Sequence, residues 1–278
     1  MHASACAIVS VALVLFVESP APSEEPVAPS SELWAVCTGN AEAPSGRLVR
    51  IDLASGTVDP LVTIEGSAGE HEPVELAFLP GGEELLVAQL HGAGTARHVT
   101  HLQTVVLADG RVRGEVRFDG WLDALEFHPR SGALWGMHCD DQGRRRLVRV
   151  DARKGKLEVV GDLPDEEFPR SLAFSPDGRE LWALTCTNQI ERDALLLLDP
   201  SDAKVLKRFP WTTEKPAHAL EIAADGRLIA VEWGGTFYEL ERANGRPTRL
   251  ATVSNPTLAG IVTGLDFRPK LPERRPAR

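Results

Sequence analysis

A stretch of thirteen residues, Ser171 to Ala183, limits most strongly what this chain can fold into. It reads S-L-A-F-S-P-D-G-R-E-L-W-A, and Leu172 and Phe174 alternate with small residues, which is the period-two pattern of a half-buried strand. The segment 176–178, Pro-Asp-Gly, predicts a turn, because Pro presets φ and Gly accepts the positive φ that closes it. A second strand then begins at Leu181. The stretch therefore predicts one β-hairpin.

The first strand of this hairpin recurs along the chain. Its five copies end at Phe78, Phe127, Phe174, Ile222 and Phe267. The intervals between these ends are 49, 47, 48 and 45 residues. A steady period of this length is typical of stacked supersecondary units, and four-stranded propeller blades have this length.

Each repeat also contains a second hairpin. The segments 48–58, 147–157 and 195–205 each read as an apolar strand, a turn that begins with Asp, and another strand. Together with the first hairpin, this second hairpin gives each repeat four antiparallel strands.

The two ends of the repeat region lack complementary strands. Leu33 to Val36 resembles a second strand with no first strand before it, whereas the segment ending at Phe267 is a first strand with no second strand after it. If residues 262–267 join three strands from residues 32–66, the two ends complete one blade and close a ring, which removes exposed sheet edges. The sequence therefore predicts an all-β fold, a five-bladed β-propeller of four-stranded antiparallel blades over residues 32–269.

The A-F-S-P-D-G-x-x-L-W repeat resembles the secreted bacterial propellers of the YVTN and WD40-like class. The resemblance covers nearly all of residues 32–269 and implies propeller architecture. It leaves the function open, because such rings include enzymes and pure binding scaffolds. After Gly56, Gly155 and Gly245 the chain lacks the Trp that quinoprotein repeats carry, so no quinone cofactor is expected.

Residues 1–21 have the pattern of a signal peptide. Cys6 to Val17 is an uninterrupted apolar run of twelve residues, which is too short to span a bilayer comfortably but suits a signal-peptide core. Small residues at Ser19 and Ala21 suit a cleavage site. No Lys or Arg precedes the run, which leaves a misassigned start codon or an uncleaved anchor as alternatives. The expected location is periplasmic or secreted.

Composition excludes several classes of partner. Apolar residues make up 43% and charged residues 25% of the chain, the balance of a soluble globular protein with a substantial core. A formal net charge of −10 repels nucleic acid and anionic membranes. We expect a monomer that binds no nucleic acid and is not inserted in the membrane after signal removal. Residues 22–31 are predicted to be a disordered linker and residues 270–278 a tail.

Two rings of residues are predicted at one mouth of the propeller channel. Four positions before the end of each first strand lie Val74, Asp123, Arg170, His218 and Thr263. Four positions after the Leu of each second strand lie Cys37, Gln89, His138, Thr185 and Glu232. Polar groups that converge on an apolar scaffold are the default site hypothesis. The predicted ligand-binding residues are Asp123, Arg170, His218, Gln89, His138, Glu232, Trp121 and Trp233. The alternative is that polar residues at a wet channel mouth have no function.

A third ring, one position before each strand end, contains Glu126, Glu221 and Asp266. Three carboxylates there suit a hard cation such as Ca²⁺, and together with a histidine they suit activation of a metal-bound water. This is the basis of an alternative function, a metal-assisted hydrolase or lactonase. The competing interpretation is that the carboxylates pair with Arg or with backbone N–H groups between blades. No D-x-D-x-D-G loop supports a metal, so a divalent metal stays an open alternative and no other cofactor is expected.

Cysteines and histidines give two further hypotheses. Cys139 and Cys186 occupy equivalent positions in adjacent repeats, which in an exported protein predicts a disulfide; Cys37 is either free or competes for the pair. Three histidines of the predicted loop 89–101 have a spacing that zinc ligands can have, but a polar loop is the favoured interpretation. They are His91, His98 and His101.

The aromatic residues divide into two sets. Trp34, Trp135 and Trp182 recur at one repeat position, which is typical of packing between blades. Trp121 and Trp233 fall beside the predicted mouth instead. We therefore expect a scaffold that binds a small molecule, a peptide or a protein partner over the channel mouth, with loops supplying specificity. No catalytic residue is predicted.

Overall fold

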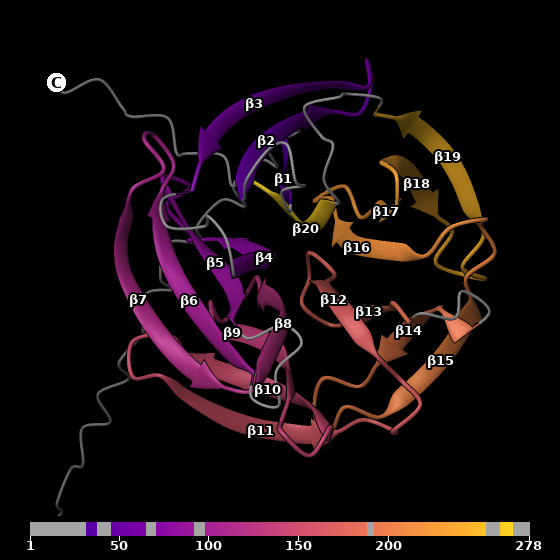
Figure 1. Cartoon of the computed structure of the whole chain (residues 1–278). Helices are drawn as coiled ribbons and strands as arrows, with labels where there is room; N and C mark the ends of the chain where they lie inside the picture. The colour runs from indigo at the N-terminus through magenta and orange to yellow at the C-terminus, as the bar shows by residue number, and fades with distance from the viewer. Residues whose placement is uncertain are drawn as a thin grey trace, which may run out of the picture.

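The computed structural model describes residues 32–37, 46–64, 71–91, 98–187, 192–253 and 262–268. These residues form five four-stranded antiparallel sheets arranged in a ring (Figure 1). The predicted five-bladed all-β propeller is therefore confirmed. The predicted signal peptide, linker and tail lie outside the described residues. No helix in the described ranges is long and apolar enough to cross a membrane.

Each blade is built in the same order from its innermost strand outward. Blade 1 consists of β20 (Val262–Phe267), β1 (Leu33–Cys37), β2 (Arg47–Asp52) and β3 (Thr57–Thr63). Blade 2 consists of β4 (His71–Phe78), β5 (Glu84–His91), β6 (Val99–Val106) and β7 (Val112–Asp119). Blade 3 consists of β8 (Trp121–Phe127), β9 (Leu134–Cys139), β10 (Arg145–Asp151) and β11 (Lys156–Asp162).

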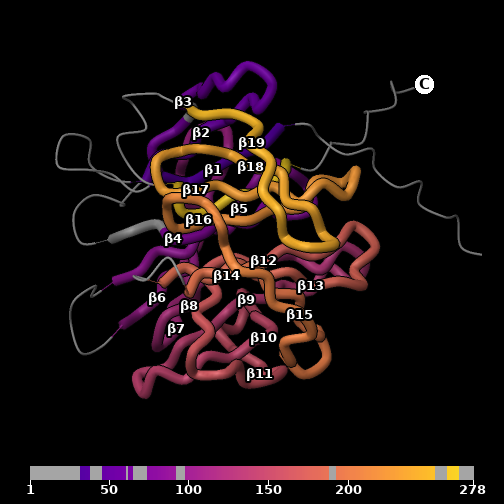
Figure 2. The backbone as a smooth tube through the Cα atoms, turned by 90° about the vertical axis from the view of Figure 1, so that its right-hand side faces the viewer, coloured from indigo at the N-terminus to yellow at the C-terminus, as the bar shows by residue number. Residues whose placement is uncertain are grey.

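The last two blades repeat the arrangement. Blade 4 consists of β12 (Pro169–Phe174), β13 (Leu181–Thr185), β14 (Ala194–Leu198) and β15 (Val205–Pro210). Blade 5 consists of β16 (Ala217–Ile222), β17 (Leu228–Glu232), β18 (Thr236–Leu240) and β19 (Pro247–Thr252). Seen from the side, blades 1 and 5 lie above blades 3 and 4 (Figure 2).

The hairpin turn that defines the repeat follows from its residues. Gly178 has a φ of 66°, and its N–H donates to the Ser175 carbonyl at 2.7 Å. The Ser175 hydroxyl donates to Asp177 at 2.6 Å and accepts from the N–H of Glu180 at 2.9 Å. Only Gly adopts this φ without strain, so the S-P-D-G sequence fixes the turn between β12 and β13.

The ring closes through the two ends of the chain. β1 pairs with β20 in antiparallel register, with Leu33 opposite Phe267 and Trp34 opposite Asp266. Residues more than 200 positions apart thus share one sheet, as the orphan strands predicted. Closure leaves every innermost strand flanked by two other innermost strands (Figure 1), so no blade presents an open face at a seam.

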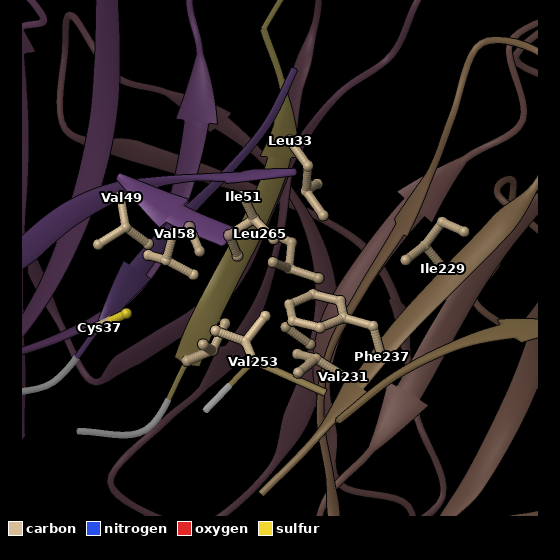
Figure 3. Close-up of a cluster of buried hydrophobic side chains, with 13 residues drawn as sticks. Leu33, Cys37, Val49, Ile51, Val58, Ile229, Val231, Phe237, Val253 and Leu265 are labelled. Carbon is tan, nitrogen blue, oxygen red and sulfur yellow. The ribbon is translucent and has the colours of Figure 1, made fainter. Parts of the chain in front are cut away.

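The core lies between blades. Five clusters of buried apolar residues each combine side chains of two neighbouring blades. At the closing seam, Leu33 and Leu265 of blade 1 lie with Phe237 and Val231 of blade 5 (Figure 3). Each sheet therefore buries both of its faces, and the position of every inner strand depends on both neighbours.

The recurring tryptophans belong to this core, as predicted. Trp34, Trp135 and Trp182 are 4%, 4% and 1% exposed. Trp135 meets Phe174 of the next blade edge-on, with ring centroids 5.5 Å apart. Blade 5 has Ile222 at the position of that Phe, and Trp182 stacks on Phe209 of its own blade at 6.3 Å instead.

Candidate functional site

Every innermost strand carries a β-bulge near its first residues, at one end of the ring. The extra residues are Val74, Ala124, Arg170, His218 and Thr263. We call this end of the ring the mouth. A bulge leaves one residue unpaired and re-aims its side chain, and bulges are common next to active sites. The same irregularity in all five blades therefore presents side chains at one level.

Four of these bulged residues are the first-ring residues predicted from the repeat. Blade 3 differs: its bulge falls at Ala124, which has a φ of 51°, and Asp123 remains paired opposite Met137. The second ring lies at the same level, because Gln89 and Glu232 pair with the residues just before the bulges, Pro73 and Ala217.

Arg170 is held at the mouth by an aromatic face. Its guanidinium carbon lies 5.0 Å from the ring centroid of Trp121, from the neighbouring blade. This is a cation–π distance. Among the described residues the guanidinium has neither a hydrogen bond nor an ion pair. Its N–H donors, five in a planar fork, are therefore available to a ligand.

Asp123 is a half-buried carboxyl next to Arg170. Burial raises its pKa to about 7, against the opposing effects of Arg170, the Trp121 indole and Arg145. Asp123 therefore titrates near neutral pH, where ordinary aspartates are fully ionised.

His218 connects Arg170 to an exposed aromatic. It is 7% exposed, and its Nε2 has no hydrogen-bond partner in the described part of the chain. Burial and the positive charge of Arg170 lower its pKa to about 4, so the imidazole is neutral at pH 7. Its ring meets Trp233 edge-on at 5.3 Å, and Trp233 is 50% exposed.

Two residues of this site were not predicted. Arg145 lies with its guanidinium carbon 3.4 Å from the ring centroid of Phe168, which is 37% exposed, and it interacts electrostatically with Asp123 and Arg170. Arg145 is the first residue of the third strand of blade 3 and pairs with Cys139. Extending the ring rule to third strands would have identified it.

Of the other predicted mouth residues, His138 and Glu232 form hydrogen bonds within the protein, and Gln89 forms none among the described residues. His138 donates from Nε2 to the Asp119 carbonyl at 2.8 Å. Glu232 accepts a hydrogen bond from the Tyr238 hydroxyl at 3.1 Å. Gln89 is fully buried, and neither its amide nitrogen nor its amide oxygen has a partner among the described residues. Their predicted role in ligand binding stays a prediction.

The third-ring carboxylates bind backbone groups. Asp266 accepts the N–H of Phe78 in the next blade at 2.6 Å, and Glu126 accepts that of Phe174 in the next blade. Glu221 accepts the N–H of its own neighbour, Ile222, at 2.7 Å. Within the described ranges, no three His, Cys, Asp or Glu side chains are placed to hold a metal ion. The contacts of Glu126 and Asp266 between blades are those of the competing interpretation, whereas Glu221 contacts its own neighbour. The role of Glu126, Glu221 and Asp266 as metal ligands stays a prediction.

The predicted disulfide is not formed. Cys139, Cys186 and Cys37 are free thiols. Cys139 directs its thiol at the Asp140 carbonyl, 3.8 Å away, and the backbone N–H of Cys186 is tied to the Phe168 carbonyl at 3.1 Å. Equivalent repeat positions place the two cysteines in adjacent blades, but this does not bring their sulfur atoms into bonding contact.

The predicted loop 89–101 is shorter than expected. β5 continues to His91 and β6 begins at Val99, which pair opposite each other. His91 and His101 therefore stack across the hairpin with ring centroids 3.7 Å apart, and His101 Nδ1 lies 2.6 Å from Glu115. Strand pairing separates them from His98, which lies against Trp121 at 5.4 Å.

No protein-family model and no curated protein matches this chain. Among solved structures, the β-propeller domain of Cps50 (Swd1) from Myceliophteria thermophila is similar at 16% identity and a TM-score of 0.45, covering 78% of this chain and 67% of that one. A protein of unknown function from Bacteroides caccae has 12% identity and a TM-score of 0.45, covering 81% and 73%. A putative 6-phosphogluconolactonase from Bacteroides fragilis has 11% identity and a TM-score of 0.44, covering 90% and 99%. The strand pairing itself defines the propeller, and similarity at this level says nothing about a ligand.

The inner carboxyls make stability depend on pH. Burial raises the pKa of Asp266 to about 7, and burial together with neighbouring carboxyls raises those of Glu126 and Glu221 well above the ordinary value. The folded chain holds these protons more tightly than the unfolded chain. Their contribution to stability is therefore complete below about pH 4 and, for Asp266, is lost as the pH rises through about 7.

Asp266→Asn is expected to stabilise the protein at pH 8. The amide oxygen still accepts the N–H of Phe78, and no buried charge forms. A pKa difference of one between the folded and unfolded chain corresponds to about 1.4 kcal/mol. Asp266 is only half-buried, and solvent screens part of its charge. We therefore expect a gain of about 2 kcal/mol in the free energy of unfolding, measured with urea. At pH 4.5, just above the pKa of an aspartate in the unfolded chain, most of the gain is lost. The matched control is Asp225→Asn, since turn hydrogen bonds lower the pKa of Asp225 and the same change there is destabilising at pH 8. A loss of stability for Asp266→Asn at pH 8 would contradict this account.

Proposed function

We propose that this chain is an exported β-propeller of the YVTN/WD40-like repeat class that binds a ligand over its mouth, without catalysis of its own. The observation that carries the proposal is the convergence of Arg170, Asp123 and His218 beside Trp121 and Trp233. These residues come from three different blades, and the described chain leaves the donors of Arg170 unused. Polar groups gathered on a rigid apolar scaffold, with aromatic surface beside them, are typical of a binding site.

The carboxylates support binding more than hydrolysis. A metal-assisted hydrolase would need at least three carboxylate or imidazole groups at one point. Glu126 and Asp266 are instead committed to backbone N–H groups of the next blade, and His138 to a carbonyl. We therefore place ligand binding first, with a small molecule, a peptide or a protein partner as the ligand and a monomer as the binding unit.

The proposed location is the periplasm or the exterior of the cell. It rests on the signal-peptide pattern of residues 1–21 and on the resemblance to secreted propellers. A net charge of −10 separately disfavours nucleic acid as a partner.

A thermal-shift screen with matched variants tests the proposed function. The purified protein is screened against sugars, lactones, organic acids and divalent metals, since any compound that binds only the folded chain raises its melting temperature. Compounds that bind the wild type are expected to lose at least tenfold in affinity with Arg170→Gln. The control is Arg227→Gln, an exposed arginine in the turn at the opposite end of β16, paired with Asp225 at 2.8 Å. A rise specific to divalent metals, or hits indifferent to Arg170→Gln, would refute binding at the mouth.

A further inference from the structure

We infer that the ligand of the mouth carries an oxyanion, a carboxylate or a phosphate, that Arg170 and Arg145 hold, and that its binding takes up a proton at Asp123. This inference rests on the proposed function and names the chemical class of the ligand. It is carried by the Arg170 cluster, which consists of Arg170, Arg145, Asp123, His218 and Trp121.

The two arginines are oriented before any ligand arrives. Arg170 projects from a bulge and lies on Trp121, and Arg145 lies on Phe168. A planar guanidinium fork matches the two oxygens of a carboxylate or phosphate. Because packing against the rings already restricts both side chains, less entropy is lost when they bind an anion. Among the described residues neither arginine has a carboxylate within ion-pair distance, and Arg145 donates one hydrogen bond, to the Gly143 carbonyl at 3.2 Å. Arginines with this support are suited to a ligand that supplies the carboxylate or phosphate.

The permanent charges of the cluster are positive. The titratable groups that face Asp123 are Arg170, Arg145, Glu75, Cys139 and Cys186. Burial raises the pKa of Cys186 to about 11, so its thiol is neutral at pH 7. Burial also raises the pKa of Glu75 well above its ordinary value, which favours the neutral form of that carboxyl. At the margin, Asp165 faces Arg145, and Asp193 accepts from the N–H of Thr187 at 2.6 Å. Two guanidinium groups side by side in a chain of net charge −10 give this part of the mouth a local preference for anions.

His218 and Trp233 extend the site beyond the arginines. The unpartnered Nε2 of His218 is buried, and a buried polar atom without a partner is costly. As an N–H tautomer it would donate a further hydrogen bond to the oxyanion. Trp233, edge-on to His218 and half exposed, offers a surface for an apolar or aromatic body. The ligand class is therefore an organic anion with an apolar part.

Asp123 couples this binding to protons. When ionised it attracts Arg170 and repels an incoming anion; when protonated it does neither and becomes a hydrogen-bond donor. An anion at Arg170 therefore raises the pKa of Asp123, and the coupling is reciprocal. Since that pKa is about 7 without ligand, affinity for the anion rises as the pH falls from 8 to 6.

The indole N–H signals of Trp121 and Trp233 in ¹⁵N NMR spectra report directly on the mouth, and Trp121→Phe and Trp233→Phe assign them. The probes are benzoate, phenyl phosphate, the neutral benzamide and the cation benzamidine, titrated at pH 6 and pH 8. We expect benzoate, phenyl phosphate or both to shift the two indole signals. The pH dependence is measured with benzoate, which keeps its charge from pH 6 to pH 8, whereas phenyl phosphate has a second pKa of about 6. Benzoate is expected to bind at least fivefold more tightly at pH 6. The stronger of the two anions identifies carboxylate or phosphate as the preferred group.

The variants separate the inference from the proposed function. Arg170→Gln is expected to weaken anion binding at least tenfold, and Asp123→Asn to remove the pH dependence while the affinity seen at pH 6 is kept; Arg227→Gln changes neither. If Arg170→Gln does not fold, Arg145→Gln and the pH profile of Asp123→Asn decide. If benzamide or benzamidine moves the indole signals as strongly as the anions, or if Asp123→Asn retains the pH dependence, the inference is overturned and binding at the mouth stands. If none of the four probes moves either signal, the inference is overturned, and the thermal-shift screen with Arg170→Gln decides on binding at the mouth.

Discussion

Truncation of the chain after residue 261 is expected to abolish cooperative folding. The deletion removes β20, the innermost strand of blade 1, so β1 loses one of its two antiparallel partners along its whole length and becomes an edge strand. It also removes Val262 and Leu265 from the cluster that joins blades 1 and 5. The innermost strands β16 and β4 then face an open seam, and exposed strand edges of this kind promote aggregation. Circular dichroism during heating is expected to give no cooperative transition, and size-exclusion chromatography to give aggregates.

Two controls make this expectation specific. Truncation after Arg268 keeps β20 and is expected to melt like the full chain. A synthetic peptide of residues 262–268, added in excess to the shortened chain, is expected to restore part of the transition by adding a strand to β1. A shortened chain that melts within a few degrees of the full chain would show that the ring does not depend on its closing strand.

The fold could be predicted from the sequence because the same strand pattern recurs five times. Each copy begins with a strand of period-two pattern, and in the repeat at Ser175 and Gly178 the residues that follow specify a tight turn. The unpaired strands at the two ends of the chain can complete a blade only by pairing with each other. Agreement between local turn chemistry and long-range pairing is what makes a sequence specify one structure.

For the site, the sequence predicted only which repeat positions lie at the mouth of the ring. Counting from Phe174 located Arg170, but nothing in the residues marked the bulge that frees it from pairing, since an added residue leaves no signature in a period-two pattern. In blade 3 the bulge moved to Ala124, which the count could not anticipate. Arg145 and Phe168 reach the mouth from a third strand and from a connecting segment, so their contacts depend on how blades 3 and 4 meet.

Residue type alone also could not decide between chemical roles. A carboxylate at the position of Asp266 suits a cation or a backbone N–H equally well, and only the position of Phe78 in the next blade distinguishes the two. Likewise, equivalent repeat positions put Cys139 and Cys186 in neighbouring blades without fixing the direction of either thiol. Such choices depend on a few ångströms between separate sheets, which repeat spacing does not determine.

Trp182→Ala is expected to lower the free energy of unfolding by about 3–5 kcal/mol, the usual cost of removing a large buried aromatic. Trp182 is 1% exposed and lies in the cluster shared by blades 4 and 5. Its ring stacks on Phe209 at 6.3 Å, and its indole N–H donates to Glu180 at 3.1 Å. The truncation leaves a cavity between two sheets whose backbones are fixed by their own ladders, so little collapse can offset the loss. Urea unfolding at constant pH measures the difference.

Trp233→Ala is the matched control, because it removes the same side chain from a half-exposed position at the mouth. Its cost in unfolding free energy is expected to stay within about 0.5 kcal/mol, whereas the affinity for a mouth ligand falls. Trp182→Ala should do the reverse, with binding per folded molecule retained. Equal costs for the two substitutions would mean that the recurring Trp does not hold the blades together. The expected result is that Trp182→Ala lowers stability and Trp233→Ala lowers binding. That result would distinguish residues that hold the blades together from residues that contact a ligand at the mouth.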